Sequence, residues 1–158
     1  MICIDKIDDG IYLGNEAAAS RLDLLKNNGI SHIIVAGIEL EPHFPIHFSY
    51  KKLEVLDRSE EKIDKYFEEC NEFIDEAINS NNRVFIHCYQ GVSRSCSIAA
   101  AYLISKKKFS PRLALDYIKS KHFECNPNKG FCEQLESYGK RINMKRAHQK
   151  NSTCCQVF

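Results

Sequence analysis

The sequence predicts an α/β fold in which a central mixed, largely parallel sheet is flanked by helices. Short apolar runs of the kind that form buried strands occur at 11–13, 33–35 and 84–86. Between and after them lie segments in which apolar residues recur at three- and four-residue steps, the period of an amphipathic helix. Strands that alternate with helices favour a mainly parallel sheet covered by its connecting helices.

The length and the charge distribution suggest one domain with a separate tail. A chain of 158 residues fits a single domain. The formal net charge is only +1, but no acidic residue follows Glu136. We therefore expect a folded domain over 1–143 and a basic, flexible tail over 144–158 that has its own partner. The basic residues after Glu136 are Lys140, Arg141, Lys145, Arg146 and Lys150.

The first half of the chain is predicted to contain three strands and one helix. Ser20 and Asp23 are spaced as a capping box, which predicts a helix that begins there, and Gly29 follows its expected end. The segment 38–50 contains two prolines and shows no clear hydrophobic period, which indicates a loop. The expected strands are at 11–13, 33–35 and 48–56, and the expected loop is at 38–50.

The second half is predicted to be mostly helical around one strand. Apolar residues recur with helical period from Tyr66 to Ile78, and the aromatic residues among them belong to the core. Ser110 and Pro111 are an N-cap and a first helical residue, so another helix begins there. Further helical segments are expected at 98–104 and along the stripe of Phe131, Leu135, Tyr138 and Ile142.

The stretch at 84–97 carries the chemistry. After the apolar strand come the pair His87-Cys88, a small turn that contains Gly91, and Arg94 at the start of an apolar helix. A strand, a tight loop and a helix in this order form an anion-binding site, because loop N–H groups and the positive end of the helix converge. The same dipoles favour the thiolate of Cys88, which is the nucleophilic form. The guanidinium of Arg94 offers two parallel hydrogen bonds to a phosphate.

This stretch also resembles a known family. His87-Cys88-Tyr89-Gln90-Gly91-Val92-Ser93-Arg94-Ser95 is similar to the signature of cysteine-dependent protein phosphatases, most of all to the dual-specificity branch. The segments 10–14, 29–33 and 126–131 extend the resemblance over most of the chain, and in the family the last of them buttresses the active-site loop. The alternative without the family is a buried thiol beside a core histidine, with Arg94 in a surface salt bridge.

The resemblance implies a role for each residue of the loop. Cys88 is expected to attack the phosphoryl group and form a phosphocysteine, Arg94 to hold the phosphoryl oxygens, and Ser95 to help the sulfur leave. The expected substrate-binding residues are His87, Tyr89, Gln90, Gly91, Val92, Ser93 and Arg94.

A general acid is also needed, because an alkoxide leaves phosphorus far less readily than an alcohol. In the family this acid is an Asp on a mobile loop about thirty residues before the cysteine. Asp57 lies 31 positions before Cys88 and follows a predicted strand, so we expect it to be the acid. The alternative is that Asp57 caps the next segment in a capping box with Glu60, in which case Glu60, Glu61 and Asp64 are rival acids.

The expected activity is therefore the hydrolysis of phosphotyrosine and phosphoserine or phosphothreonine in proteins, without a metal or another cofactor. The partner is a phosphorylated protein, and no nucleic acid is expected. Three alternatives remain: a phosphoinositide phosphatase, an RNA 5'-triphosphatase and a non-catalytic phosphate-binding module. Phosphoinositide sites usually place Lys in the loop, where this chain has Tyr89 and Gln90.

The cysteine pattern points to a reducing compartment. The eight cysteines include no C-x-x-C pair and no His-Cys ligand spacing, so we expect free thiols and no metal site. No signal peptide is evident, and the longest apolar run, 98–104, is far shorter than a membrane span. We expect a cytoplasmic protein, and the sequence predicts no particular oligomeric state.

The carboxyl-terminal residues suggest a lipid anchor. Cys155-Gln156-Val157-Phe158 is similar to a C-a-a-X prenylation box, in which Gln156 departs from the aliphatic pattern. Cys154 offers a palmitoylation site, and the basic tail would add attraction to an anionic membrane. Prenylated phosphatases of the regenerating-liver type share this tail, but their loop lacks the serine that is present here as Ser95. The alternative is a tail whose cysteines carry no lipid.

Overall fold

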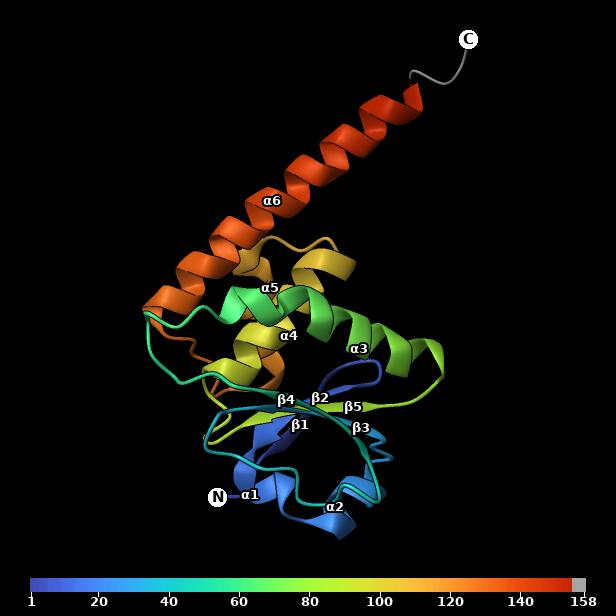
Figure 1. Cartoon of the computed structure of the whole chain (residues 1–158), viewed down its shortest axis with the longest axis vertical. Helices are drawn as coiled ribbons and strands as arrows, with labels where there is room; N and C mark the ends of the chain where they lie inside the picture. The colour runs from blue at the N-terminus through green and yellow to red at the C-terminus, as the bar shows by residue number, and fades with distance from the viewer. Residues whose placement is uncertain (155–158) are drawn as a thin grey trace.

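The computed structural model describes residues 1–154 (Figure 1). Its five-stranded sheet has the order β1-β2-β5-β3-β4. β1 and β2 are antiparallel and all the other pairs are parallel, which confirms a mixed, largely parallel sheet. The strands are β1 (Ile4–Asp8), β2 (Ile11–Asn15), β3 (His32–Ala36), β4 (Ser49–Leu53) and β5 (Val84–Cys88).

Helices cover both faces of this sheet (Figure 1). Two short helices, α1 (Glu16–Ala19) and α2 (Leu22–Asn27), lie on one face. The other face carries α3, α4, α5 and α6, and a 3-10 turn, η1, leads into α3. The bounds of these elements are η1 (Ile63–Tyr66), α3 (Phe67–Asn79), α4 (Arg94–Lys106), α5 (Pro111–Lys121) and α6 (Lys129–Cys154).

The predicted capping box at Ser20 and Asp23 is wrong. The helix expected there is split in two, because the Asn15 side chain accepts a hydrogen bond from Ala18 N and starts α1 earlier. Ser20 instead lies at the carboxyl end of α1, and its hydroxyl donates to Ala17 O. By contrast, Ser110 caps α5 with Pro111 in its first turn, as predicted.

The strand β5 is central and completely buried, which fixes the position of the residues that follow it. Alternate side chains of β5 enter two cores: Ile86 packs toward α3 to α6, and Phe85 packs toward α1 and α2. Cys88 is the last residue of β5 and pairs with Asn15 of β2. The next helix, α4, is buried from Arg94 to Ile104. Cys88 therefore lies between two rigid elements at the carboxyl edge of the sheet.

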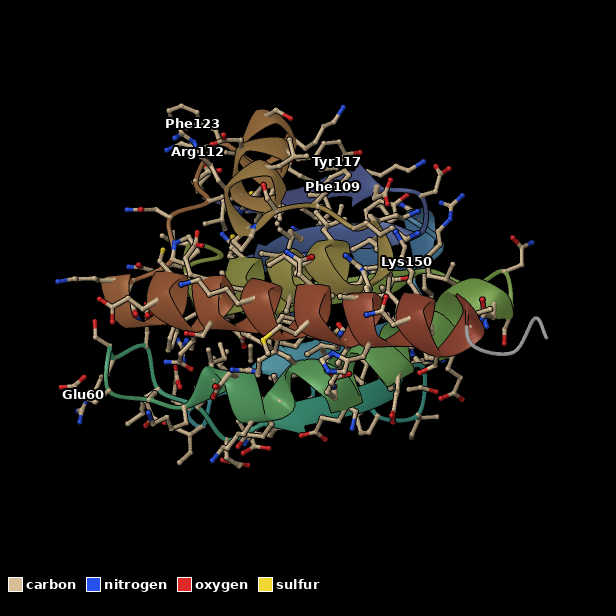
Figure 2. The ribbon with its side chains drawn as sticks, turned by 90° about the horizontal axis from the view of Figure 1, so that it is seen from above. Glu60, Phe109, Arg112, Tyr117, Phe123 and Lys150 are labelled. Atoms are coloured by element: carbon tan, nitrogen blue, oxygen red, sulfur yellow. The ribbon has the colours of Figure 1, made fainter. Side chains whose placement is uncertain are left out.

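The last helix is longer than the predicted stripe. It runs from Lys129 to Cys154, and its later turns extend away from the body (Figure 1). Seen from above, α6 crosses the molecule between α3 and α5 (Figure 2). Arg146 joins it to the end of α4 by donating to the carbonyls of Ile104 and Ser105, at 3.0 and 2.8 Å. None of the helices within residues 1–154 combines the length and apolar character that a membrane crossing needs.

Candidate active site

The loop after β5 forms a cup whose carbonyl groups face outward. Donors from the surrounding protein bind the carbonyl oxygens of Tyr89, Gly91, Val92 and Ser93: these donors are Glu16 N, His122 Nε2, Asn126 N and Ser97 N. In a planar peptide the N–H points opposite to the carbonyl, so the N–H groups of the same four peptides face the cleft. These N–H groups belong to Gln90, Val92, Ser93 and Arg94. Gly91 permits this path, because it has a φ of +74° and a Cβ there would lie 2.8 Å from Gly14 O. The loop is therefore built to hold an anion.

Cys88 lies at the bottom of this cup. Its residue is only 2% exposed, and its Sγ is 3.3 Å from the hydroxyl of Ser95. The thiol borders a cleft of about 220 Å³. The cleft is lined by Glu39, Asp57, Cys88, Tyr89, Gln90, Val92, Ser93 and Arg94. The predicted nucleophile, arginine and acid thus meet at one cleft.

Arg94 is buried beside the same cleft and is held by a residue that the sequence analysis missed. Its Nη1 and Nη2 donate to the two carboxylate oxygens of Glu39, at 2.9 and 2.6 Å, and Nη1 also donates to Val55 O at 3.2 Å. The hydrogen bond from Arg94 lowers the pKa of Glu39. Arg94 Nε is buried and has no hydrogen-bond partner among residues 1–154. Arg94 is therefore ion-paired with the half-exposed Glu39, but its own side chain is buried beside the cleft and does not lie on the surface.

His87 lies behind the loop and does not line the cleft. Its ring stacks on Phe85 and places Nδ1 3.4 Å from Cys88 O and 3.5 Å from a carboxylate oxygen of Glu16. Burial lowers the pKa of His87 to about 4, so the ring is neutral near pH 7. Its place in the structure suits the ordering of the loop rather than contact with a bound group.

Asp57 is exposed at the rim of the cleft, on the loop after β4. β4 ends at Leu53, earlier than predicted, so Asp57 lies on the loop beyond the strand. Asn128 donates from Nδ2 to Asp57 Oδ1 at 2.8 Å, and its backbone N donates to Ser93 Oγ at 3.0 Å. Asn128 therefore connects the cup to the loop on which Asp57 lies.

The rival acids on this loop lie elsewhere. Glu60 projects outward from the loop (Figure 2), and it lines a separate depression together with Glu61. Asp64 lies in η1, and its backbone N donates to Oε1 of Gln134 on α6. Among these four carboxylates, only Asp57 borders the cleft that contains Cys88.

The segment at 122–131 supports the loop from behind, as the resemblance implied. Asn126 N donates to Val92 O at 2.8 Å, and His122 Nε2 donates to Gly91 O at 2.5 Å. A side chain at Gly130 would collide with the backbone of Ser59, so this segment also packs against the loop after β4. His122 is completely buried and was not singled out from the sequence.

A buried thiol under a cup of amides, with a buried guanidinium beside it, defines the class of enzymes that hydrolyse phosphate esters through a cysteine. Residues 11–141 match the family model described as "Dual specificity phosphatase, catalytic domain", and the chain belongs to this family. It is 39% identical to dual specificity protein phosphatase 1B of Arabidopsis thaliana over 139 residues, which cover 88% of this chain and 83% of that relative.

Solved structures agree with this assignment. The chain is similar to the crystal structure of DUSP15, with 34% sequence identity and a TM-score of 0.85. The match covers 94% of this chain and 95% of the DUSP15 chain. The structure of the human tyrosine phosphatase-like serine/threonine/tyrosine-interacting protein is 33% identical with a TM-score of 0.85, covering 89% and 97%. The predicted family, fold and cysteine-based protein phosphatase activity are confirmed. The substrates of this enzyme are phosphorylated proteins.

Proposed function

We propose that this phosphatase hydrolyses phosphotyrosine and phosphoserine or phosphothreonine through a phosphocysteine on Cys88. The observation that carries the proposal is the convergence of Cys88 Sγ, Arg94 and the inward-facing amides on one cleft, with Asp57 at its rim. The family supports both kinds of substrate.

The first step transfers the phosphoryl group to the enzyme. The Cys88 thiolate attacks phosphorus, and the S–P bond forms as the bond to the leaving oxygen breaks. The loop amides and Arg94 bind the three non-bridging oxygens, and Arg94 Nε is the donor that residues 1–154 leave unpaired. Asp57 gives its proton to the leaving oxygen, so that an alcohol or phenol departs.

The second step returns the enzyme to its starting state. The carboxylate of Asp57 accepts a proton from water, and the resulting oxygen attacks phosphorus as the S–P bond breaks. Ser95 Oγ, 3.3 Å from the sulfur, donates a hydrogen bond to the departing thiolate. Inorganic phosphate leaves, and Asp57 is protonated again for the next cycle.

The nucleophile is tested with Cys88→Ser. Turnover of phosphopeptides should fall below detection, whereas binding of a phosphotyrosine peptide should remain measurable, because the amides and Arg94 are untouched. Cys132→Ser, a change at a partly exposed thiol outside the cleft, is the matched control and should keep full turnover. Turnover that survives in Cys88→Ser would falsify the assignment.

The substrate class is tested by a side-by-side assay. The wild-type enzyme is given a phosphotyrosine peptide, a phosphothreonine peptide, an inositol phospholipid and a triphosphorylated RNA at equal concentration. We expect the two peptides to have the highest kcat/KM, because Tyr89 and Gln90 at the cleft bring no positive charge for a polyanionic ligand. Faster turnover of the lipid or the RNA would move the enzyme to that class.

We also propose a cytoplasmic catalytic domain over 1–143 and a basic segment over 144–158 that associates with anionic membranes through a lipid on Cys155, assisted by Cys154. Cys155 lies outside the described residues. The support is the set of exposed basic side chains on α6, which includes Lys140, Lys145 and Lys150. Detergent partitioning of the full chain in cells should shift to the aqueous phase on Cys155→Ser, and an unchanged distribution would remove the anchor.

A further inference from the structure

Four side chains of metal-ligand type meet behind the phosphate-binding loop. Cys3, Asp5, His122 and Glu124 place one ligand atom each within 4.8 Å of one another. The sequence shows no metal-ligand spacing for this group, because Cys3 and His122 are 119 positions apart and meet only through the fold. This group does not overlap with the residues that line the catalytic cleft.

The distances within the group suit a small cation. Cys3 Sγ lies 3.3 Å from Asp5 Oδ2 and 3.7 Å from His122 Nδ1. A tetrahedral zinc ion with bonds of about 2.0–2.3 Å separates its ligands by about 3.3–3.8 Å. Asp5 Oδ2 and His122 Nδ1, now 2.7 Å apart, would have to separate by about half an ångström, as expected when an ion replaces a shared proton.

The hydrogen bonds of His122 leave two acceptor atoms facing each other. Its Nε2 must donate to Gly91 O, because a carbonyl oxygen can only accept. A neutral imidazole then has no proton left on Nδ1, yet Nδ1 lies 2.7 Å from a carboxylate oxygen of Asp5. A proton must therefore lie between these two atoms, in a residue that is completely buried. A metal ion can take the place of this proton.

Cys3 is held in position, and both Cys3 and Glu124 can be reached from solvent. The backbone of Cys3 exchanges two hydrogen bonds with Asn15, of 3.2 and 3.1 Å, and Gly14 lacks the Cβ that would collide with Cys3 O. Cys3 and Glu124 also line an open cavity of about 580 Å³ that provides an entry path. A bound divalent cation removes the proton of a ligating thiol.

We propose that Cys3, Asp5, His122 and Glu124 form a binding site for a zinc-type divalent cation. Thiolate and imidazole ligands favour zinc over magnesium or calcium. A zinc ion displaces the proton shared by Asp5 and His122 and the thiol proton of Cys3, so the net charge of the site does not change. Nε2–H donation from the ligating histidine to a backbone carbonyl is the usual second interaction of such a ligand. Here that carbonyl belongs to Gly91, so the ion fixes the ring that holds the phosphate loop.

The test measures metal binding rather than catalysis. The full chain carrying Cys88→Ser, which removes the active-site thiolate as a competing ligand, is titrated with zinc against a chromophoric chelator. Cobalt is then used as a spectroscopic probe. We expect one tight site, the release of about two protons per zinc ion, and a thiolate-to-cobalt charge-transfer band.

Two variants in this background locate the site. Cys3→Ser and Glu124→Gln should weaken zinc binding by at least the roughly 10- to 100-fold that loss of an outer-shell partner costs. Only Cys3→Ser should remove the charge-transfer band. Both positions are partly or fully exposed, so neither change removes a core side chain. Cys132→Ser is the matched thiol control and should bind as tightly as the parent. Equal affinity in Cys3→Ser and Cys132→Ser, or a cobalt band that persists without Cys3, would overturn the proposal.

Discussion

Replacement of Asp57 by Asn gives the sharpest test of the proton donor, because the change leaves the geometry intact. Asn has the same shape, and its side-chain oxygen can accept the 2.8 Å hydrogen bond that Asn128 now donates to Asp57. The position is exposed, so the substitution buries no new polar group. What is lost is the proton that the leaving oxygen needs.

The size of the loss depends on the leaving group. A positioned general acid contributes about 10²- to 10⁴-fold, or about 2.7–5.5 kcal/mol of the barrier at about 1.36 kcal/mol per tenfold. We expect this loss for phosphoserine, whose alkoxide is a poor leaving group. An activated aryl phosphate releases an anion that needs no proton, so its first step should slow by less than about tenfold.

The assay measures the first turnover, because Asp57 also acts in the second step. Rapid mixing of enzyme and substrate in comparable amounts follows the burst of released alcohol or phenol for Asp57→Asn and wild type. Glu60→Gln is the matched control, since Glu60 lies on the same loop but outside the cleft, and it should keep wild-type bursts with both substrates. Equal slowing of the two substrates in Asp57→Asn, or a leaving-group effect in Glu60→Gln, would refute the role of Asp57.

Two further predictions concern the support of the cup. Glu39→Gln removes the charge that holds both Nη atoms of Arg94, and because Glu39 is 42% exposed we expect a loss of only about 1–2 kcal/mol, or roughly 5- to 30-fold in kcat/KM. Glu41→Gln, which breaks an exposed pair with Lys52, is its control, and equal activity of the two variants would contradict a positioning role for Glu39. Because the pKa of His87 is lowered to about 4 in the folded protein, the unfolded chain protonates this imidazole more readily than the folded chain does. The contribution to stability is therefore fully present above about pH 6.5 and declines on acidification toward pH 4, by about 3 kcal/mol in total. Urea unfolding should show this extra decline in wild type and not in His87→Gln, and parallel pH profiles would refute it.

The parts of the fold and site that could be predicted are local in sequence. Cys88, Gly91, Arg94 and Ser95 lie within eight residues, from the end of β5 to the first turn of α4, so their meeting depends only on short-range geometry. The amphipathic period likewise predicted the position of α3. The edge strand β1 was not predicted, because its IDKID sequence is rich in charged residues and only Ile7 is buried.

The contacts that were missed are long-range. Glu39 reaches Arg94 across 55 positions. Asn128 lies in the segment 126–131 that was expected to buttress the loop, but its contact with Asp57 across 71 positions was not predicted. Neither contact has a local signal, since an exposed Glu or a turn Asn is common without a function. The capping box at Ser20 failed for a similar reason: Asn15, fixed by the pairing of β2 with β5, caps the chain first. A capping residue whose position depends on strand pairing cannot be predicted from the residues next to it in the sequence.

Whether the phosphoryl group passes through Cys88 can be measured directly during turnover. Ser95→Ala removes the hydroxyl 3.3 Å from the sulfur, so the second step should slow and the phosphoenzyme should accumulate. Acid quenching within the first turnover, followed by peptide mass spectrometry, should find phosphate on Cys88. Two results would exclude Cys88 as the nucleophile. One is phosphate on another residue, and the other is steady turnover without a phosphoenzyme in both Ser95→Ala and Cys88→Ser.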